Sequence, residues 1–163
     1  MAMNTAAGRH TIEMSRPVPV PFDAAVAVMK HAPWRAVTSA FAASWTGGDP
    51  EAGVGVDLPG GVHVERTVRV GFGSPFQEDD AFVTPVWWQA AQHPQRYPTF
   101  DGAFELRPQD GATEIRLTGG YRPPFGSIGR IADGVVGHRI VLASLETLLA
   151  AAADRLAGAT EIR

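Results

Sequence analysis

The sequence lacks cysteine entirely, and this absence excludes disulfide bonds, thiolate zinc sites and catalysis by a thiol. It also lacks an excess of positive charge, because the net charge is −3 and no basic patch contains interleaved aromatic residues. Nucleic acid is therefore not expected as a partner. The longest apolar stretch, Ile140 to Ala153, is interrupted by polar residues and falls short of a membrane span.

Several signals for targeting and catalysis are absent as well. The segment from Met1 to Arg16 has no apolar core for a signal peptide, so we expect a cytoplasmic protein. The histidines lie too far apart for a paired-ligand motif, and neither a metal nor another cofactor is expected. The chain contains no Gly-x-Ser-x-Gly elbow, no phosphate-binding loop and no dinucleotide-binding fingerprint. Catalysis is not excluded, but no motif indicates it.

The chain does contain enough apolar residues for one folded domain, together with many residues that break helices. Of its 163 residues, 45% are hydrophobic, whereas 18 are glycine and 13 are proline. This composition favours many short strands and turns over a helical bundle. We expect a flexible leader over residues 1–9, a single domain over residues 10–157 and a flexible tail over residues 158–163.

Alternating hydrophobicity predicts a series of strands. The clearest alternation runs from Val62 to Phe72, where apolar residues share one face and polar residues share the other. Asp110-Gly111 predicts a tight turn between the last two strands, and Glu78 to Asp80 predicts an acidic turn. The other predicted strands are His10–Val18, whose prolines confine it to an edge or end it, Val54–Leu58, Ala81–Ala90, Phe100–Arg107 and Ala112–Tyr121.

Helical spacing predicts three helices. Two are short, from Phe22 to Lys30 and from Trp34 to Trp45. The third runs from Ile128 to Leu156 with apolar residues at every third or fourth position, which gives about 43 Å of helix. Gly158 is its expected stop. Only this helix is long enough to cover the apolar face of the predicted sheet.

Local sequences in the second half of the chain add a resemblance. They are Trp87-Trp88, the segment from Tyr97 to Gly102, the strand Thr113–Tyr121, and the segment from Arg122 to Asp133 before the long helix. In these segments and in the order of its elements, the chain resembles the START-like, helix-grip superfamily, also called SRPBCC. That superfamily includes polyketide cyclase/dehydrase-like and lipid-transfer proteins.

The resemblance implies an α+β helix-grip fold with an internal hydrophobic cavity. In this fold a curved antiparallel sheet and two short helices wrap around a long C-terminal helix. A closed antiparallel barrel resembling a lipocalin is an alternative that would also bind apolar ligands. The long terminal helix makes that barrel the weaker interpretation.

Three polar residues are candidates for catalysis because they interrupt apolar patterns. His138 lies on the stripe of the long helix, Arg66 lies on the apolar face of its strand, and Tyr121 closes the last strand. An enzyme would use them as base, oxyanion partner and acid. Each also has a structural interpretation. His138 fits a core histidine or one at the edge of the stripe, Arg66 a bulge or a wet sheet edge, and Tyr121 a packing residue.

Two functions fit these features of the sequence. One is the binding or carrying of a small hydrophobic molecule, such as a lipid, between the sheet and the long helix. The other is a polyketide cyclase/dehydratase-like enzyme that uses polar residues of the same cavity. The ligand, the occurrence of a reaction, and the choice between monomer and homodimer stay open. So does the choice between Trp87 and Trp88 as the tryptophan that faces the cavity, since neighbours in a strand face opposite ways. The residues expected to contact the ligand are Val64, Arg66, Val68, Val70, Trp88, Phe104, Ile115, Leu117, Tyr121, Val135, His138, Leu142 and Leu145.

Overall fold

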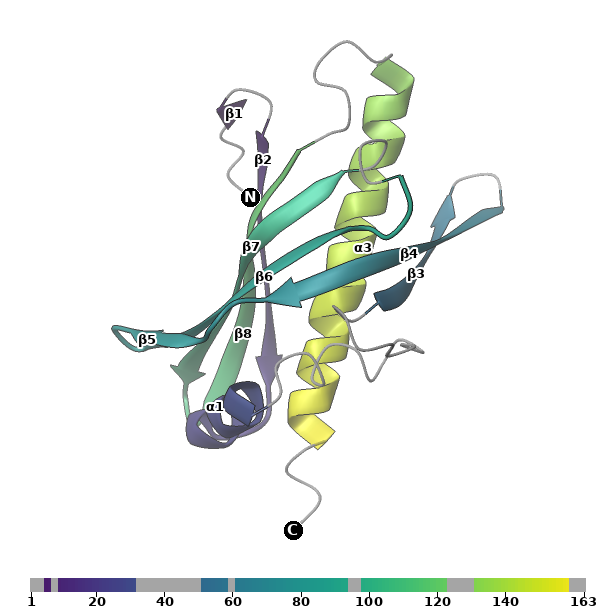
Figure 1. Cartoon of the computed structure of the whole chain (residues 1–163). Helices are drawn as coiled ribbons and strands as arrows, with labels where there is room; N and C mark the ends of the chain where they lie inside the picture. The colour runs from purple at the N-terminus through teal and green to yellow at the C-terminus, as the bar shows by residue number, and fades with distance from the viewer. Residues whose placement is uncertain are drawn as a thin grey trace.

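A computed structural model describes residues 5–6, 9–31, 51–58, 61–93, 98–122 and 131–158 of the chain. In Figure 1 the long helix α3 lies across a curved sheet, and the short helix α1 lies at one end of that sheet. The elements in chain order are β1 (Thr5–Ala6), β2 (Arg9–Val18), α1 (Phe22–His31), β3 (Glu51–Leu58), β4 (Val62–Phe72), β5 (Phe76–Glu78), β6 (Ala81–Ala90), β7 (Thr99–Gln109), β8 (Ala112–Arg122) and α3 (Ile131–Gly158).

The described strands form one antiparallel sheet in the spatial order β1-β2-β8-β7-β6-β4-β3, with β5 paired to β6. The first long strand, β2, therefore lies beside the last strand, β8. Because the two strands are antiparallel, His10 near the start of β2 lies directly opposite Tyr121 near the end of β8. This pairing brings residues from the two ends of the domain to the same edge of the sheet.

The strand series predicted from the sequence is confirmed. β4 and β6 have the predicted bounds, and the remaining predicted strands extend further by up to three residues. The predicted turn between β7 and β8 is confirmed by positive φ angles of 48° at Asp110 and 82° at Gly111. One prediction was incomplete, because the acidic turn is confined to Asp79 and Asp80 while Phe76–Glu78 forms β5. A strand of three exposed residues carries too little alternation to be recognised.

The two described helices agree with the predicted pattern. α1 has Ala25 and Met29 fully buried, as expected for its apolar spacing. α3 ends at Gly158 as predicted and begins at Ile131, since residues 128–130 lie outside the described residues. The predicted helix from Trp34 to Trp45 also lies outside them. Neither α1 nor α3 is long and apolar enough to cross a membrane.

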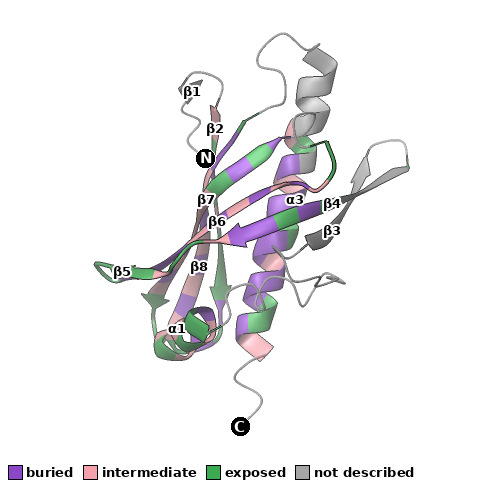
Figure 2. Ribbon diagram, in the orientation of Figure 1, coloured by how far each residue is buried: buried purple, intermediate pink, exposed green. Residues whose placement is uncertain are grey.

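The core lies between α3 and the inner face of the sheet. α3 packs against β2, β3 and β8, and Figure 2 shows its buried positions following one side of the helix. The prediction for Leu142 needs correction: it is half-buried, and the neighbouring Val141 is fully buried instead. The predicted burial of the other stripe residues that the structure describes is confirmed, and the buried residues of α3 among them are Val141, Ser144, Leu145, Leu148, Leu149, Ala151, Ala152, Ala153 and Leu156.

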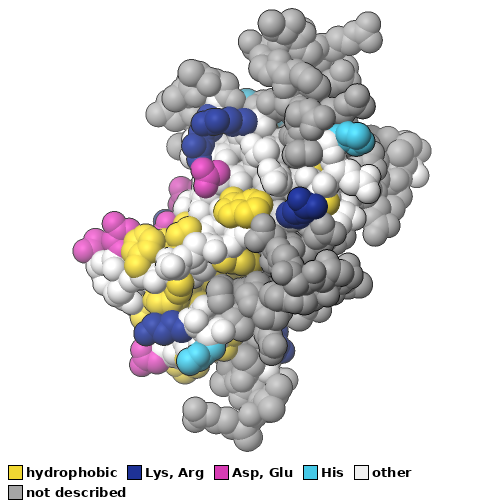
Figure 3. Space-filling model, in the orientation of Figure 1, with side chains coloured by type: hydrophobic (Ala, Val, Ile, Leu, Met, Phe, Trp, Pro, Cys, Tyr) yellow, Lys and Arg dark blue, Asp and Glu magenta, His cyan; other side chains and the backbone are white. Residues whose placement is uncertain are grey.

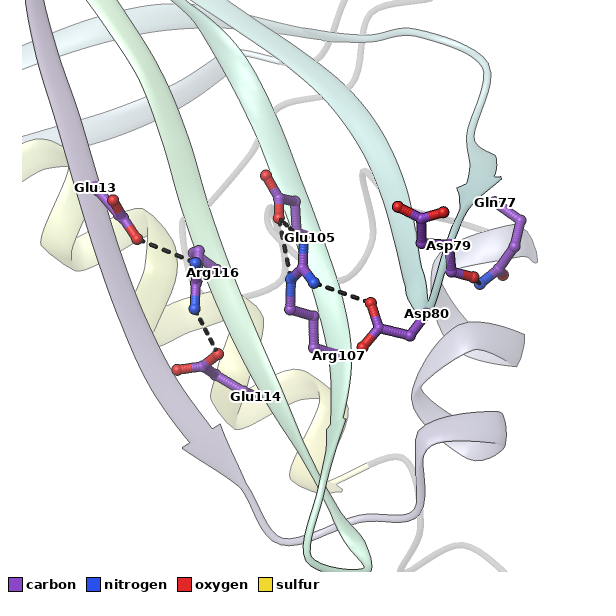
Figure 4. A network of polar contacts seen from close by, with 8 residues as sticks. All are labelled: Glu13, Gln77, Asp79, Asp80, Glu105, Arg107, Glu114 and Arg116. Atoms are coloured by element: carbon purple, nitrogen blue, oxygen red, sulfur yellow. Dashed lines mark hydrogen bonds and ion pairs between the residues drawn. The ribbon is translucent and has the colours of Figure 1, made fainter.

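The outer face of the sheet is charged over β2, β7 and β8. Arg116 pairs with Glu13 and Glu114, each at 3.1 Å, and Arg107 pairs with Glu105 and with Asp80 (Figure 4). Ion pairs at the protein surface contribute about 0–1 kcal/mol each. Their main effect concerns which face of the sheet is exposed. A face with this many charges favours contact with water, so the opposite, apolar face packs against α3.

The outer face near β5 has a different character. In the space-filling view of Figure 3, hydrophobic side chains lie beside acidic ones over this strand. Phe76 is the one large hydrophobic residue that is exposed among the side chains that the structure describes. A single exposed ring is ordinary for a protein surface.

Two inward-facing glycines shape the middle of the sheet. Gly102 on β7 and Gly119 on β8 are directly opposite each other. A Cβ atom on Gly119 would lie 2.6 Å from the carbonyl oxygen of Asp101 and 2.7 Å from the ring of Phe100. The missing side chains thus let the strands approach closely and let the Phe100 ring lie over the backbone.

Candidate functional site

A row of five residues crosses the inner face of the sheet. The first is a valine, and the other four carry rings. Val70, Trp88, Phe100, Tyr121 and His10 stand directly opposite one another on successive strands β4, β6, β7, β8 and β2. Directly opposed residues share a face of the sheet, so all five belong to the face that α3 covers. Four of them are buried and His10 is half-buried. The row is apolar at β4 and becomes polar at β2.

This arrangement shows which of the two adjacent tryptophans, Trp87 or Trp88, faces the interior. Trp88 belongs to the buried core, whereas Trp87 is half-buried on the outer face. The Trp87 ring lies over Gly71 of β4, where a Cβ atom would come within 2.1 Å of the indole. Trp88 is therefore the tryptophan that a molecule between the sheet and α3 would meet.

A cluster of three polar rings forms at the polar end of the row. Tyr121 of β8 and His138 of α3 are joined by a hydrogen bond between the phenolic oxygen and Nδ1. The ring of His10, from β2, stacks on Tyr121 with a centroid separation of 4.9 Å and an interplanar angle of 15°. The centroids of His10 and His138 are 6.0 Å apart. Three elements distant in sequence thus contribute to one site.

Burial shifts the acid–base properties of this cluster. It raises the pKa of Tyr121 above its usual value, because the buried phenolate is poorly solvated. Burial also lowers the pKa of His138, and positive charge on His10 adds to this effect. Tyr121 and His138 are accordingly both uncharged at neutral pH. The phenol is the stronger acid of the two, so Tyr121 donates to Nδ1 and leaves Nε2 of His138 for another partner.

A second polar group lies on the inner face, nearer to α1. Thr84 of β6 is fully buried, and its hydroxyl group has no hydrogen-bond partner among the described residues. Its cross-strand neighbour is Phe104, which is also fully buried. Thr113, another buried threonine, differs because its hydroxyl donates to the carbonyl oxygen of Val20 at 2.8 Å.

The structure brings together two of the three candidate catalytic residues, Tyr121 and His138. The side chains of Arg66, Val64 and Val135 lie outside the described residues, so their predicted roles stay predictions. The other residues predicted to contact a ligand all belong to the core or pack against it; they are Val68, Val70, Trp88, Phe104, Ile115, Leu117, Leu142 and Leu145. Their contact with a ligand also stays a prediction.

Sequence reasoning missed His10 and Thr84. His10 marked only the start of a strand, and its position became meaningful once β2 was paired with β8. Thr84 could have been noticed from its even spacing with Phe82, Val86 and Trp88, which places it on the inward side of β6. No group of three or more histidine, aspartate or glutamate side chains within the described residues is arranged to hold a metal ion.

Comparison with solved structures finds proteins of the same architecture. The chain is similar to Ara h 8.0201 with a TM-score of 0.57 and 13% identity, over 93% of this chain and 99% of that one. Norcoclaurine synthase from Thalictrum flavum gives a TM-score of 0.54 and 13% identity, over 95% and 88% of the two chains. The Zhui aromatase/cyclase from Streptomyces sp. R1128 gives 0.51 and 15%, over 94% of each.

These likenesses confirm the predicted START-like, helix-grip fold over nearly the whole chain. At identities this low they show the fold alone, because one fold can host many unrelated functions. No protein-family model matches the sequence, and no curated protein matches it.

Proposed function

We propose that the protein binds a small hydrophobic molecule between the inner face of the sheet and α3. The observation that carries this proposal is the row from Val70 to His10, in which apolar and aromatic side chains on the inner face end in hydrogen-bonding groups. Ligand sites in proteins commonly have this composition, with an apolar lining and a few polar groups that fix orientation.

The expected strength of binding follows from apolar area. A probe that buries about 300 Å² of apolar surface gains about 7 kcal/mol, from which the cost of lost freedom on binding is subtracted. A net gain of about 7 kcal/mol would give a dissociation constant of about 10 μM, so a probe that does not use the polar cluster is expected to bind more weakly than this. A natural ligand that also bonds to His138 would bind more tightly.

The test is a fluorescence titration with 1-anilinonaphthalene-8-sulfonate on two matched variants. Trp88→Phe alters the inner face, whereas Trp87→Phe makes the same substitution on the outer face. We expect saturable binding at one site per chain, with an affinity that changes at least threefold in Trp88→Phe and stays constant in Trp87→Phe. No saturable binding, or equal effects of both substitutions, would contradict the proposed location.

A second candidate function is acid–base catalysis, and the Tyr121–His138 pair favours it. Enolisation moves a proton from the carbon beside a carbonyl group to a base, while an acid donates a proton to the carbonyl oxygen. In this cluster Nε2–H of His138, whose Nδ1 accepts from Tyr121, would donate to the carbonyl oxygen, and the imidazole of His10, with its centroid 6.0 Å from that of His138, would accept the proton from carbon. Norcoclaurine synthase and the Zhui aromatase/cyclase, which share the fold, are named for reactions.

This candidate is tested by hydrogen exchange rather than by a complete reaction. Deuterium uptake at the carbon between the carbonyl groups of benzoylacetone, followed by NMR, reports enolisation directly. An enzyme of this kind should accelerate the uptake, and His138→Asn should reduce the acceleration by a factor of about 100 or more while binding stays within a few-fold. Unchanged exchange in the variant would leave ligand binding as the function.

A further inference from the structure

Thr84 is a polar residue on the inner face that takes no part in the Tyr121–His138 cluster. Its side chain is fully shielded from solvent, and its hydroxyl has no partner among the described residues. Buried hydroxyl groups are normally hydrogen-bonded, because desolvation without a compensating bond is unfavourable. Among the buried side-chain atoms that the structure describes, the other without a partner is Nε of Arg116, which lies in the charged ladder of the outer face.

The described residues of the sheet around Thr84 offer no partner for its hydroxyl. Its neighbours on the same face along β6 are Phe82 and Val86, and its cross-strand neighbour is Phe104. All three are buried and apolar. The described residues therefore leave the Thr84 hydroxyl able to bond to a bound molecule.

Thr84 and the polar cluster occupy opposite ends of the inner face. Thr84 lies four residues before Trp88 on β6, and Tyr121 lies opposite Phe100, which in turn lies opposite Trp88. These steps amount to about 14 Å along the strand and about 10 Å across two strands, or roughly 17 Å in all. Between the two ends lie the inward glycines Gly102 and Gly119, over which the ring of Phe100 lies close to the backbone.

We infer that Thr84 is a second polar anchor of the proposed ligand site, and that the ligand is an elongated apolar molecule with an oxygen at each end. One oxygen, as a hydroxyl or carbonyl group, bonds to Thr84. The other bonds to Nε2 of His138, whose Nδ1 is engaged by Tyr121. This inference rests on the proposed function, because it assumes that a ligand lies between the sheet and α3.

The test compares two rigid probes in three variants by calorimetric titration. The probes are trans-4-hydroxystilbene and trans-4,4′-dihydroxystilbene, which differ only by the second hydroxyl group. Thr84→Val removes the hydroxyl at nearly constant shape, and Thr84→Ser retains it. Thr118→Val is the matched control, because Thr118 lies on the outer face with its hydroxyl bonded to Glu105.

Wild type should bind the dihydroxy probe about 3- to 10-fold more tightly than the monohydroxy probe, the usual effect of one hydrogen bond. Thr84→Val should abolish this preference, while Thr84→Ser and Thr118→Val should keep it. In the absence of a probe, Thr84→Val should unfold at the same urea concentration as wild type or a higher one, because it removes an unpartnered group.

Other results would distinguish a failure of the inference about Thr84 from a failure of the proposed function. If both probes bind equally to wild type, or if Thr84→Val keeps the preference, the inference about Thr84 is wrong and the proposed function stands. A lower urea midpoint for Thr84→Val would likewise overturn it, by showing that the hydroxyl has a partner within the protein. If neither probe binds to wild type, the proposed function fails and the inference fails with it.

Discussion

Replacing Tyr121 with phenylalanine isolates the hydrogen bond at the centre of the polar cluster. The substitution keeps the ring that stacks on His10 and removes only the hydroxyl group that bonds to Nδ1 of His138. The net loss of one hydrogen bond costs about 1 kcal/mol, and the half-buried nitrogen left without a partner adds up to about 1 kcal/mol more. We therefore expect Tyr121→Phe to lower the free energy of unfolding by about 1–2 kcal/mol.

Urea unfolding followed by circular dichroism at pH 7.5 measures this loss, and a double-mutant cycle assigns it to the pair. His138→Leu removes the acceptor. In the double variant Tyr121→Phe/His138→Leu, neither side chain has a polar atom. The two single effects should together exceed the double effect by about 1 kcal/mol. Additive effects within about 0.5 kcal/mol would refute the claim that Tyr121 and His138 interact in solution.

Three further predictions concern the rest of the fold. Since the pKa of His138 is lowered by folding, its contribution to stability is present above about pH 6.5 and is lost as the pH falls through the folded-state pKa, by up to about 1.4 kcal/mol per pH unit. Urea midpoints at pH 7.5 and 5.5 should differ more in wild type than in His138→Leu, and an equal difference would contradict this. Gly119→Ala should destabilise the protein by about 2 kcal/mol or more, because its Cβ would lie 2.6 Å from the carbonyl oxygen of Asp101. A change below about 0.5 kcal/mol in urea unfolding would show that the strands β7 and β8 do not approach this closely. Asp80→Asn should change the unfolding free energy by no more than about 0.5 kcal/mol, because its pair with Arg107 is exposed, and a larger loss would contradict the view of the outer face as a solvated surface.

Local sequence patterns predicted most of the fold because turn conformation and one-sided burial of strands and helices both leave a mark on the local sequence. The turn at Asp110-Gly111 needs two residues that tolerate positive φ, and both residue types do so. The alternation in Val62–Phe72 and the three- and four-residue spacing in the last helix reflect burial on one side of each element. Leu142 was misplaced since the adjacent Val141 fits the same spacing, and periodicity alone cannot fix the rotation of a helix within one position.

The site could be predicted only in part because its geometry depends on long-range pairing. His138 and Tyr121 were identified as polar residues in apolar patterns, but nothing local showed that they would share a hydrogen bond. His10 joined them through the pairing of the first long strand with the last, a register that neither strand specifies by itself. The orientation of Trp87 and Trp88 depends in the same way on Gly71, which makes room for Trp87 on the outer face.

The most direct test of a ligand site between the sheet and α3 is a methyl NMR titration of the protein with 1-anilinonaphthalene-8-sulfonate. We expect saturable shifts of the methyl groups of Ile115 and Leu117 on the inner face and of Leu145 on α3, all of them fully buried in the core. The methyl groups of Val83, which lies opposite Phe76 and outside that core cluster, should stay unchanged. Shifts at Val83 without shifts at Leu117 and Leu145 would contradict the proposed site, as would the absence of any saturable change.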